Sequence, residues 1–385
     1  MGFGELALIC AVALVGPLLS LPRLLHVPVV IGELTVGIVV GATGLGWLHA
    51  DNATFHFLGE IGFALVMMVA GSHVPVRDPA LLAGLRAGAL RAVAIGVLAV
   101  PSGMLLASVF GTGHPGLYAV LLASSSASLV MPSLEGITTS APAIVRLLPQ
   151  LAIADAACIV VLPLAVDPSS TRRALVGGAA VLVAGALLFL GLRWAVNSGR
   201  ERRVHELSED RGLAIELRTS LTLLFGLAAV ATAFHVSVML AGFVAGLALA
   251  GAGEPRRLAK QLFALTEGFF GPIFFVWLGA SLDLRVVASH PSSVVLGVAL
   301  GAAAVVLHGS MALTGQPWPV AVVTSAQLGV PVAAVTLGAA SGTLGSGEAG
   351  AILLGALVTV AATVVAIGRV RALALGGGSS AGVAS

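Results

Sequence analysis

The sequence predicts an all-α polytopic membrane protein, with about thirteen transmembrane helices arranged as two inverted-topology repeats. Of its 385 residues, 58% are apolar and 9% are charged, and the mean hydropathy is +1.07. This composition is too apolar for a soluble globular domain. Apolar runs long enough to cross a bilayer follow one another, and short phrases of the first half recur in the second. We therefore expect membrane-spanning helices to make up most of the chain.

Prolines, glycines and charged residues divide the chain into apolar segments, each about as long as one membrane crossing. Both cysteines, Cys10 and Cys158, lie inside such segments, so we expect neither a disulfide nor a metal site. The expected helices occupy residues 3–20, 28–44, 54–73, 87–110, 115–137, 145–166, 172–195, 212–233, 236–252, 259–281, 291–311, 318–340 and 346–367.

The basic residues predict the orientation of these helices, because cytoplasmic loops of membrane proteins collect Lys and Arg. With the N-terminus outside and an odd number of helices, all 19 Lys and Arg residues except Arg172, Arg173 and Arg285 fall on the cytoplasmic side. We therefore expect an extracytoplasmic N-terminus and a cytoplasmic C-terminus.

Three pairs of phrases indicate an internal repeat. The sequence SASLVMPSL at 126–134 resembles SAQLGVPVA at 325–333, in the fifth and twelfth expected helices. Weaker similarities join 67–77 with 275–285 and 32–37 with 242–247. Each pair is seven helices apart, and an odd separation reverses the direction of crossing, which is the plan of many secondary transporters.

This repeat divides the chain into two halves. We expect a first half at 1–196, a charged cytoplasmic linker at 197–211, an inverted second half at 212–368 and a disordered cytoplasmic tail at 369–385.

Proline occurs at equivalent places in the strongest repeat pair. Because proline removes a backbone donor and disturbs the preceding turn, we expect Pro132 and Pro331 to break the fifth and twelfth helices near mid-membrane, where the two would cross. A simple proline kink is the alternative. Beside the first break, Ser125 and Ser126 offer hydroxyl ligands for a small cation, or they bond back to carbonyls of their own helix.

One carboxylate, Asp155, lies in the middle of the apolar run LAIADAACIVVL at 151–162. An ionised group near the bilayer centre costs about 2.5–3.5 kcal/mol or more, so such groups are usually kept for ion or proton chemistry. We therefore expect Asp155 to bind the transported ion or proton.

Four phrases in this order resemble the bacterial cation:proton antiporter-2 family of sodium/hydrogen exchangers. They are VPVVIGELTVGIVVGATGLG at 27–46, LGEIGFALVMMVAG at 58–71, MLAGFVAGLAL at 239–249 and FFGPIFFVWLGASLDLR at 269–285. The resemblance covers about residues 6–365. It implies the sodium/proton antiporter fold, in which a dimer domain and an ion-carrying core are built from two inverted repeats, and it implies a homodimer in the bacterial inner membrane.

The resemblance also assigns site residues. The family's Thr-Ser pair corresponds to Ser125 and Ser126, and its ion-binding aspartate corresponds to Asp155. Electrogenic members resemble one another in having two adjacent acids, whereas Ala154 precedes Asp155 here.

The eleventh and twelfth helices also depart from the family pattern. His308 is the only basic group offered deep in the eleventh helix, where relatives commonly carry Lys or Arg. It is either a core histidine or a titrating partner of Asp155. In the twelfth helix Gly329 and Val330 replace a common Gly-Glu pair, which leaves Gln327 as the polar group.

These residues predict a secondary transporter that exchanges Na⁺ or K⁺ for protons by alternating access, with both ions competing for Asp155. One titrating carboxylate implies electroneutral exchange. We expect no enzymatic activity, no cofactor, no nucleic-acid partner and no metal beyond the transported cation. Two alternatives stay open: a symporter of an organic solute, or a channel, with similar architecture, and a non-transporting sensor or scaffold, which Ala154, His308 and Val330 would suit.

The predicted orientation can be tested with reporter fusions. A reporter fused after Arg203 should be cytoplasmic and one fused after Arg173 extracytoplasmic, because the linker carries the densest group of basic residues. Compartment-specific alkaline phosphatase and fluorescent reporters distinguish the two sides, and the opposite pattern would refute the orientation.

Overall fold

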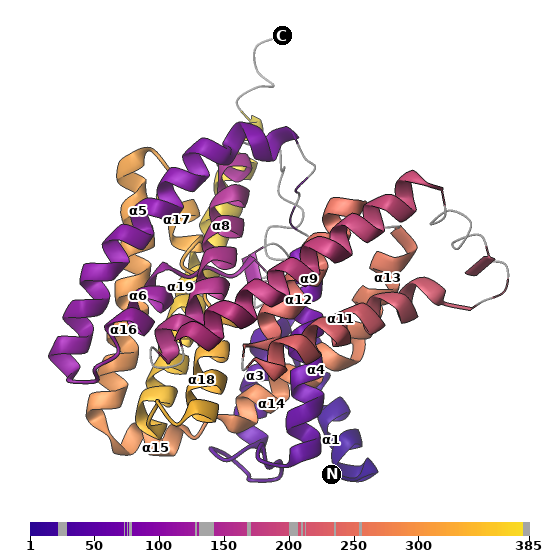
Figure 1. The fold of residues 1–385 in the computed structure, drawn as a ribbon. Coiled ribbons are helices and arrows are strands. Elements are labelled where there is room, and N and C mark those ends of the chain that lie inside the picture. The colour runs from indigo at the N-terminus through magenta and orange to yellow at the C-terminus, as the bar shows by residue number, and fades with distance from the viewer. Residues whose placement is uncertain are drawn as a thin grey trace. The chain divides into compact units, whose positions relative to one another are not determined.

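The computed structural model describes residues 1–21, 29–72, 74, 76, 79–127, 129–130, 142–167, 171–199, 207–208, 211, 213–234, 236–253 and 256–379. Over these residues the protein consists of helices and connecting segments, with no strand (Figure 1). The N-terminal part contains α1 (Phe3–Ala13), α2 (Val15–Ser20), α3 (Val29–Val40), α4 (Ala53–Ser72), α5 (Pro79–Phe110), α6 (Pro115–Ala123), α8 (Pro142–Val166) and α9 (Thr171–Asn197).

The second part of the chain is also helical. It contains α11 (Ile215–Ala233), α12 (Val238–Ala252), α13 (Arg256–Leu265), the π-helix η2 (Thr266–Phe270), α14 (Gly271–Ser281), α15 (Leu284–Ser289), α16 (Pro291–Gly309), the 3₁₀-helix η3 (Ser310–Thr314), α17 (Trp318–Val323), α18 (Gly329–Ser341) and α19 (Ser346–Ser379).

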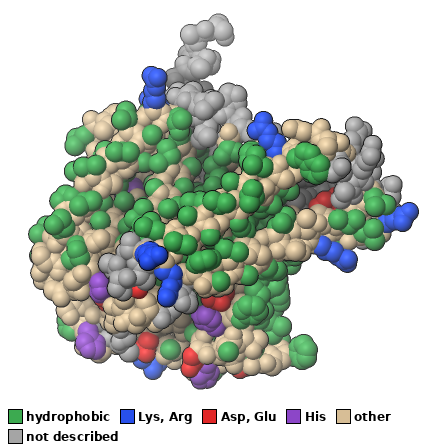
Figure 2. Space-filling model, in the orientation of Figure 1, with side chains coloured by type: hydrophobic (Ala, Val, Ile, Leu, Met, Phe, Trp, Pro, Cys, Tyr) green, Lys and Arg blue, Asp and Glu red, His purple; other side chains and the backbone are tan. Residues whose placement is uncertain are grey.

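The predicted all-α polytopic class is confirmed. Within the described residues, eight helices are long and apolar enough to cross a membrane, and four further apolar helices are shorter. Every segment predicted to be helical contains at least one observed helix. Hydrophobic side chains cover much of the visible face and charged ones are few (Figure 2), as expected for a surface that contacts lipid.

Two compact units make up the chain, and each draws on both halves of the sequence. Unit 1 comprises Met1–Pro17, Val30–Asp78 and Pro168–Ser281, and unit 2 comprises Leu18–Val29, Pro79–Asp167 and Leu282–Ser385. These units group residues that contact one another, whereas the predicted halves at 1–196 and 212–368 group residues by sequence repeat, so the units do not test the repeat. The inverted repeat therefore stays a prediction.

Close contact between helix backbones holds unit 1 together. A side chain at Gly246 of α12 would collide with the carbonyl oxygen of Met68 on α4, and one at Gly71 of α4 would collide with that of Phe243. Small residues at helix interfaces allow such approach, which is how membrane helices associate without a hydrophobic driving force between them.

In unit 2, α16 and α19 run in the same direction. Gly297 of α16 packs against Ala351 and Leu354 of α19, and further along Gly301 packs against Val358. The starts of these two helices consequently lie at the same end of unit 2.

The predicted linker and tail differ in outcome. Residues 197–211 lie largely outside the described residues. The tail does not begin at Arg369 as a disordered segment, because α19 continues to Ser379, so that expectation is wrong for the described residues 369–379. The residues after Arg369 include alternating alanines and leucines, which favour a helix.

Candidate ion-binding site

Two helices of unit 2 are interrupted. Helix α6 ends at Ala123, and its C-cap Ser124 has an extended backbone with φ −71° and ψ 154°. Helix α17 ends at Val323, and α18 begins at Gly329. The residues between these ends form two non-helical segments, 124–126 and 324–328, which we call the first and second breaks.

The second break does not lie at its predicted proline. Pro331 occupies the first turn of α18, and the break precedes it. A proline is tolerated in a first helical turn because those N–H groups have no partner within the helix. Pro331 thus fixes where α18 starts after the break. Pro132 lies outside the described residues.

Hydrogen bonds join the two breaks. The Ser125 hydroxyl donates to the carbonyl oxygen of Thr324 at 2.8 Å, and the Gln327 side-chain amide donates to that of Ser124 at 3.4 Å. The structure therefore brings together the two segments that the repeated phrases paired. Gln327 also donates its backbone N–H to the Thr359 hydroxyl of α19 at 3.3 Å, which fixes the second break against a third helix.

Asp155 lies at the first break. It belongs to α8, its side chain is 5% exposed, and its Oδ2 accepts the backbone N–H of Ala127 at 3.3 Å. In the described part of the chain we find no hydrogen bond to its other carboxyl oxygen. The structure thus places the predicted ion-binding carboxylate beside the residues that follow Ser125 and Ser126.

The serines of the first break differ in their hydrogen bonds. Ser124 donates back to the Leu121 carbonyl of its own helix at 2.8 Å. Ser125 instead donates across to the second break, and both hydroxyls keep their oxygen lone pairs for a further partner. Both Ser125 and Ser126 are 2% exposed. Of the two interpretations of this serine cluster, back-bonding holds for Ser124 and fails for Ser125.

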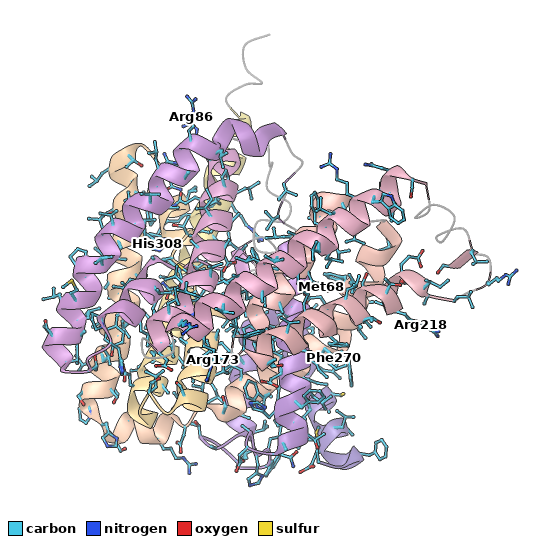
Figure 3. All side chains as sticks on the ribbon, in the orientation of Figure 1. Met68, Arg86, Arg173, Arg218, Phe270 and His308 are labelled. Carbon is cyan, nitrogen blue, oxygen red and sulfur yellow. The ribbon has the colours of Figure 1, made fainter. Side chains whose placement is uncertain are left out.

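His308 contacts the second break and the last turn of α6, and its described hydrogen bonds do not include Asp155. It lies in α16 (Figure 3), is 1% exposed, and places Nδ1 2.8 Å from the Thr324 hydroxyl and Nε2 3.2 Å from the Leu122 carbonyl oxygen. A carbonyl only accepts, so Nε2 donates. These partners support the interpretation as a hydrogen-bonded core histidine, and none of its described contacts is with the carboxylate.

Several polar residues of this network were not predicted from the sequence. Gln316 donates to the Oε1 of Gln150 at 3.1 Å, and Gln150 donates to the Thr324 hydroxyl at 3.4 Å. All three side chains are buried. The Oε1 of Gln316 is buried and makes no hydrogen bond within the described residues. The sequence feature that could have identified them is a glutamine within an apolar run, since buried polar groups require hydrogen-bond partners.

The arrangement combines a carboxylate, hydroxyl oxygens and backbone carbonyls freed by two helix breaks. Oxygen ligands of this kind suit a hard cation, and interrupted membrane helices are the usual setting for such a site. The same carboxylate can bind a proton instead, so a cation and a proton can compete for one group.

The chain is similar to proteins of a known family. The family model described as "Sodium/hydrogen exchanger, transmembrane" matches residues 10–373. The Na⁺/H⁺ antiporter of Enterococcus hirae is 25% identical over 291 residues, which are 73% of this chain and 73% of that protein. The glutathione-regulated potassium-efflux system protein KefC of Klebsiella pneumoniae is 29% identical over 284 residues, which are 69% of this chain but 43% of KefC.

A solved structure shows the same fold. The sodium proton antiporter MjNhaP1 from Methanocaldococcus jannaschii matches with a TM-score of 0.65 and 17% identity, covering 97% of each chain. The fold expected from the sequence resemblance is therefore confirmed. Because the family model spans almost the whole sequence, this chain belongs to the sodium/hydrogen exchanger transmembrane family.

Proposed function

We propose that this protein exchanges a monovalent cation, Na⁺ or K⁺, for protons across a membrane, with Asp155 as the shared binding group. The observation that carries the proposal is the position of this buried carboxylate at the first of two helix breaks, which are hydrogen-bonded to each other. The names of the relatives, a sodium/proton antiporter and a potassium-efflux protein, support the class of reaction and leave both cations as candidates.

In the proposed mechanism the site alternates between the two faces of the membrane, and only the occupied site crosses. A cation is held by Asp155, by the oxygens of Ser125 and Ser126, and by carbonyls of the first break, and a proton on Asp155 replaces it for the return. Unit 2 is the proposed carrier because all these ligands belong to it. Gln327 and Pro331 set the geometry of the second break.

The location and assembly follow the same reasoning. We propose that the protein spans the bacterial inner membrane with its N-terminus outside and its C-terminus in the cytoplasm, because the basic residues segregate in that sense. We also propose a homodimer, as the family resemblance implies.

Replacing the titrating carboxylate tests the central claim. Asp155→Asn should abolish exchange, because an amide of the same shape cannot bind and release the proton, while folding and insertion stay intact. Exchange is measured in proteoliposomes with a pH-sensitive dye under gradients of Na⁺, K⁺ or Li⁺.

Asp51→Asn is the matched control, since Asp51 is an exposed aspartate in a connecting segment, and it should exchange normally. Near-normal exchange by Asp155→Asn would refute the assignment. A wild-type protein that is silent with every cation would favour the scaffold alternative.

The serines provide a second test because their hydrogen bonds differ. Ser125→Ala removes a candidate ligand oxygen and the bond to the second break, so the apparent KM for the cation should rise about tenfold, the size expected for losing one interaction with a charged group. Ser124→Ala removes a bond to its own helix and should change KM by less than about twofold. Equal effects of the two variants would contradict the ligand role of Ser125.

Charge balance gives a third prediction. One carboxylate exchanges one proton for one monovalent cation, and Ala154, the neighbour of Asp155, is buried and adds no second acid. A membrane potential, worth about 2.3 kcal/mol per charge per 100 mV, should then not drive net exchange. The cation and proton gradients at which net exchange stops, measured in proteoliposomes, should stay the same as the voltage is varied.

A shift of these gradients with voltage would disprove electroneutral exchange. Loss of that shift in His308→Ala would then identify His308 as a second proton carrier.

A further inference from the structure

A second titratable cluster lies in unit 2, away from the breaks. Glu348 in the first turn of α19 accepts two hydrogen bonds on one oxygen, Oε1. His114 Nδ1 lies 2.8 Å from it, and the Tyr118 hydroxyl donates to it at 2.7 Å. Tyr118 is fully buried, while the side chains of His114 and Glu348 are 24% and 12% exposed. We call these three residues the α6–α19 link.

The link joins α6 and α19, and Gln327 of the second break connects the same two helices a second time. His114 immediately precedes α6 and Tyr118 lies in its first turns, whereas Ser124 follows the end of α6. There Gln327 donates its side-chain amide to the carbonyl of Ser124 and its backbone N–H to Thr359 of α19. Helices α6 and α19 are thus tied to each other at the link and, through Gln327, at the site.

We propose that Glu348, held by His114 and Tyr118, is a positioning residue that keeps the ion-binding end of α6 in register with α19, and that proton binding by His114 strengthens this hold. The inference rests on the proposed exchange at Asp155. It adds a proton-responsive element that is separate from the transported proton. With the orientation proposed above, the link lies at the extracytoplasmic end of unit 2.

The physical basis is the change from a hydrogen bond to an ion pair. Neutral His114 can donate one N–H to the carboxylate, and protonated His114 adds the attraction of opposite charges in a partly buried setting. The hold is therefore strongest when His114 is protonated and Glu348 is still ionised.

Other charged groups at this end of unit 2 belong to neighbouring elements. Glu348 and His114 contact each other and Tyr118 rather than these groups in the described part of the chain. The neighbouring groups are Asp167 after α8, Asp283 and Arg285 beside α15, and His290 at the start of α16.

Tyr118 is the only tyrosine in the chain, so labelling with 3-fluorotyrosine gives a single ¹⁹F resonance that reports on the link without any transport. In the full-length protein this resonance should shift with pH and show an inflection where His114 changes its protonation state. The inflection should vanish in His114→Gln, whose amide still donates but cannot gain a proton. It should persist in Asp155→Asn. A resonance that does not titrate, or that titrates equally in His114→Gln, would overturn the proposal.

Transport supplies a second readout. The ratio of apparent cation KM, His114→Gln over wild type, should be about one at alkaline pH on the link's face and rise about two- to fivefold at acidic pH, the range for a partly exposed ion pair. A merely structural role would give a constant ratio. His56→Gln is the control, because His56 lies 3.9 Å from Glu60 in unit 1 and should give a ratio near one throughout.

The ¹⁹F resonance and the KM ratio distinguish failure of the proposed exchange at Asp155 from failure of the positioning role of Glu348. Normal exchange by Asp155→Asn would refute the proposed function and leave the ¹⁹F result standing. A ratio that does not change with pH would refute the positioning role even if exchange at Asp155 is confirmed.

Discussion

The hydrogen bond from the backbone of Ala127 to the carboxylate of Asp155 ties the fold to its chemistry. In a continuous helix this N–H would donate to the carbonyl of Ala123, four residues earlier. Because α6 stops at Ala123, the donor is released and turns to the carboxylate. The helix break and the buried acid therefore depend on each other: the break would leave an unsatisfied donor in an apolar setting without the acid, and the acid would lack its donor without the break.

Three further groups released by the breaks are also satisfied by residues from other segments of unit 2. The carbonyl of Leu122 accepts from His308, and that of Thr324 accepts from Ser125. Thr359 of α19 accepts the N–H of Gln327. Buried polar side chains thus supply partners where the breaks leave backbone groups without helical hydrogen bonds, as a low-dielectric environment requires.

Most of the fold could be predicted from the sequence because each membrane crossing needs a long apolar run, and such runs are visible one by one. The pairing of the two breaks was also predictable, since SASLVMPSL and SAQLGVPVA carry the same pattern. The position of the second break was not, because the proline pattern marks the start of α18 rather than the break itself. Local propensity shows that a helix is interrupted but not which side of the proline unwinds.

Side-chain partnerships were harder to predict than helices. The sequence left His308 as either a core histidine or a partner of Asp155, and in the structure its ring contacts Leu122 and Thr324. Gln150 and Gln316 are far apart in sequence, and nothing in either apolar run identifies the other as a partner. Such pairs depend on which faces of distant helices meet, which periodicity alone does not determine.

The distribution of these contacts bears on how the proposed carrier could move. All the hydrogen bonds described for the two breaks, for His308 and for the link at Glu348 join residues of unit 2. Hydrogen bonds within one unit can be kept when that unit moves as a rigid body, whereas bonds shared between two units would have to break and re-form at each step. In unit 1 the glycine contacts let the backbones of α4 and α12 approach closely. Because the hydrogen bonds around Asp155 stay within unit 2, rigid-body movement of the proposed carrier would not add the cost of breaking them to the cost of burying the carboxylate.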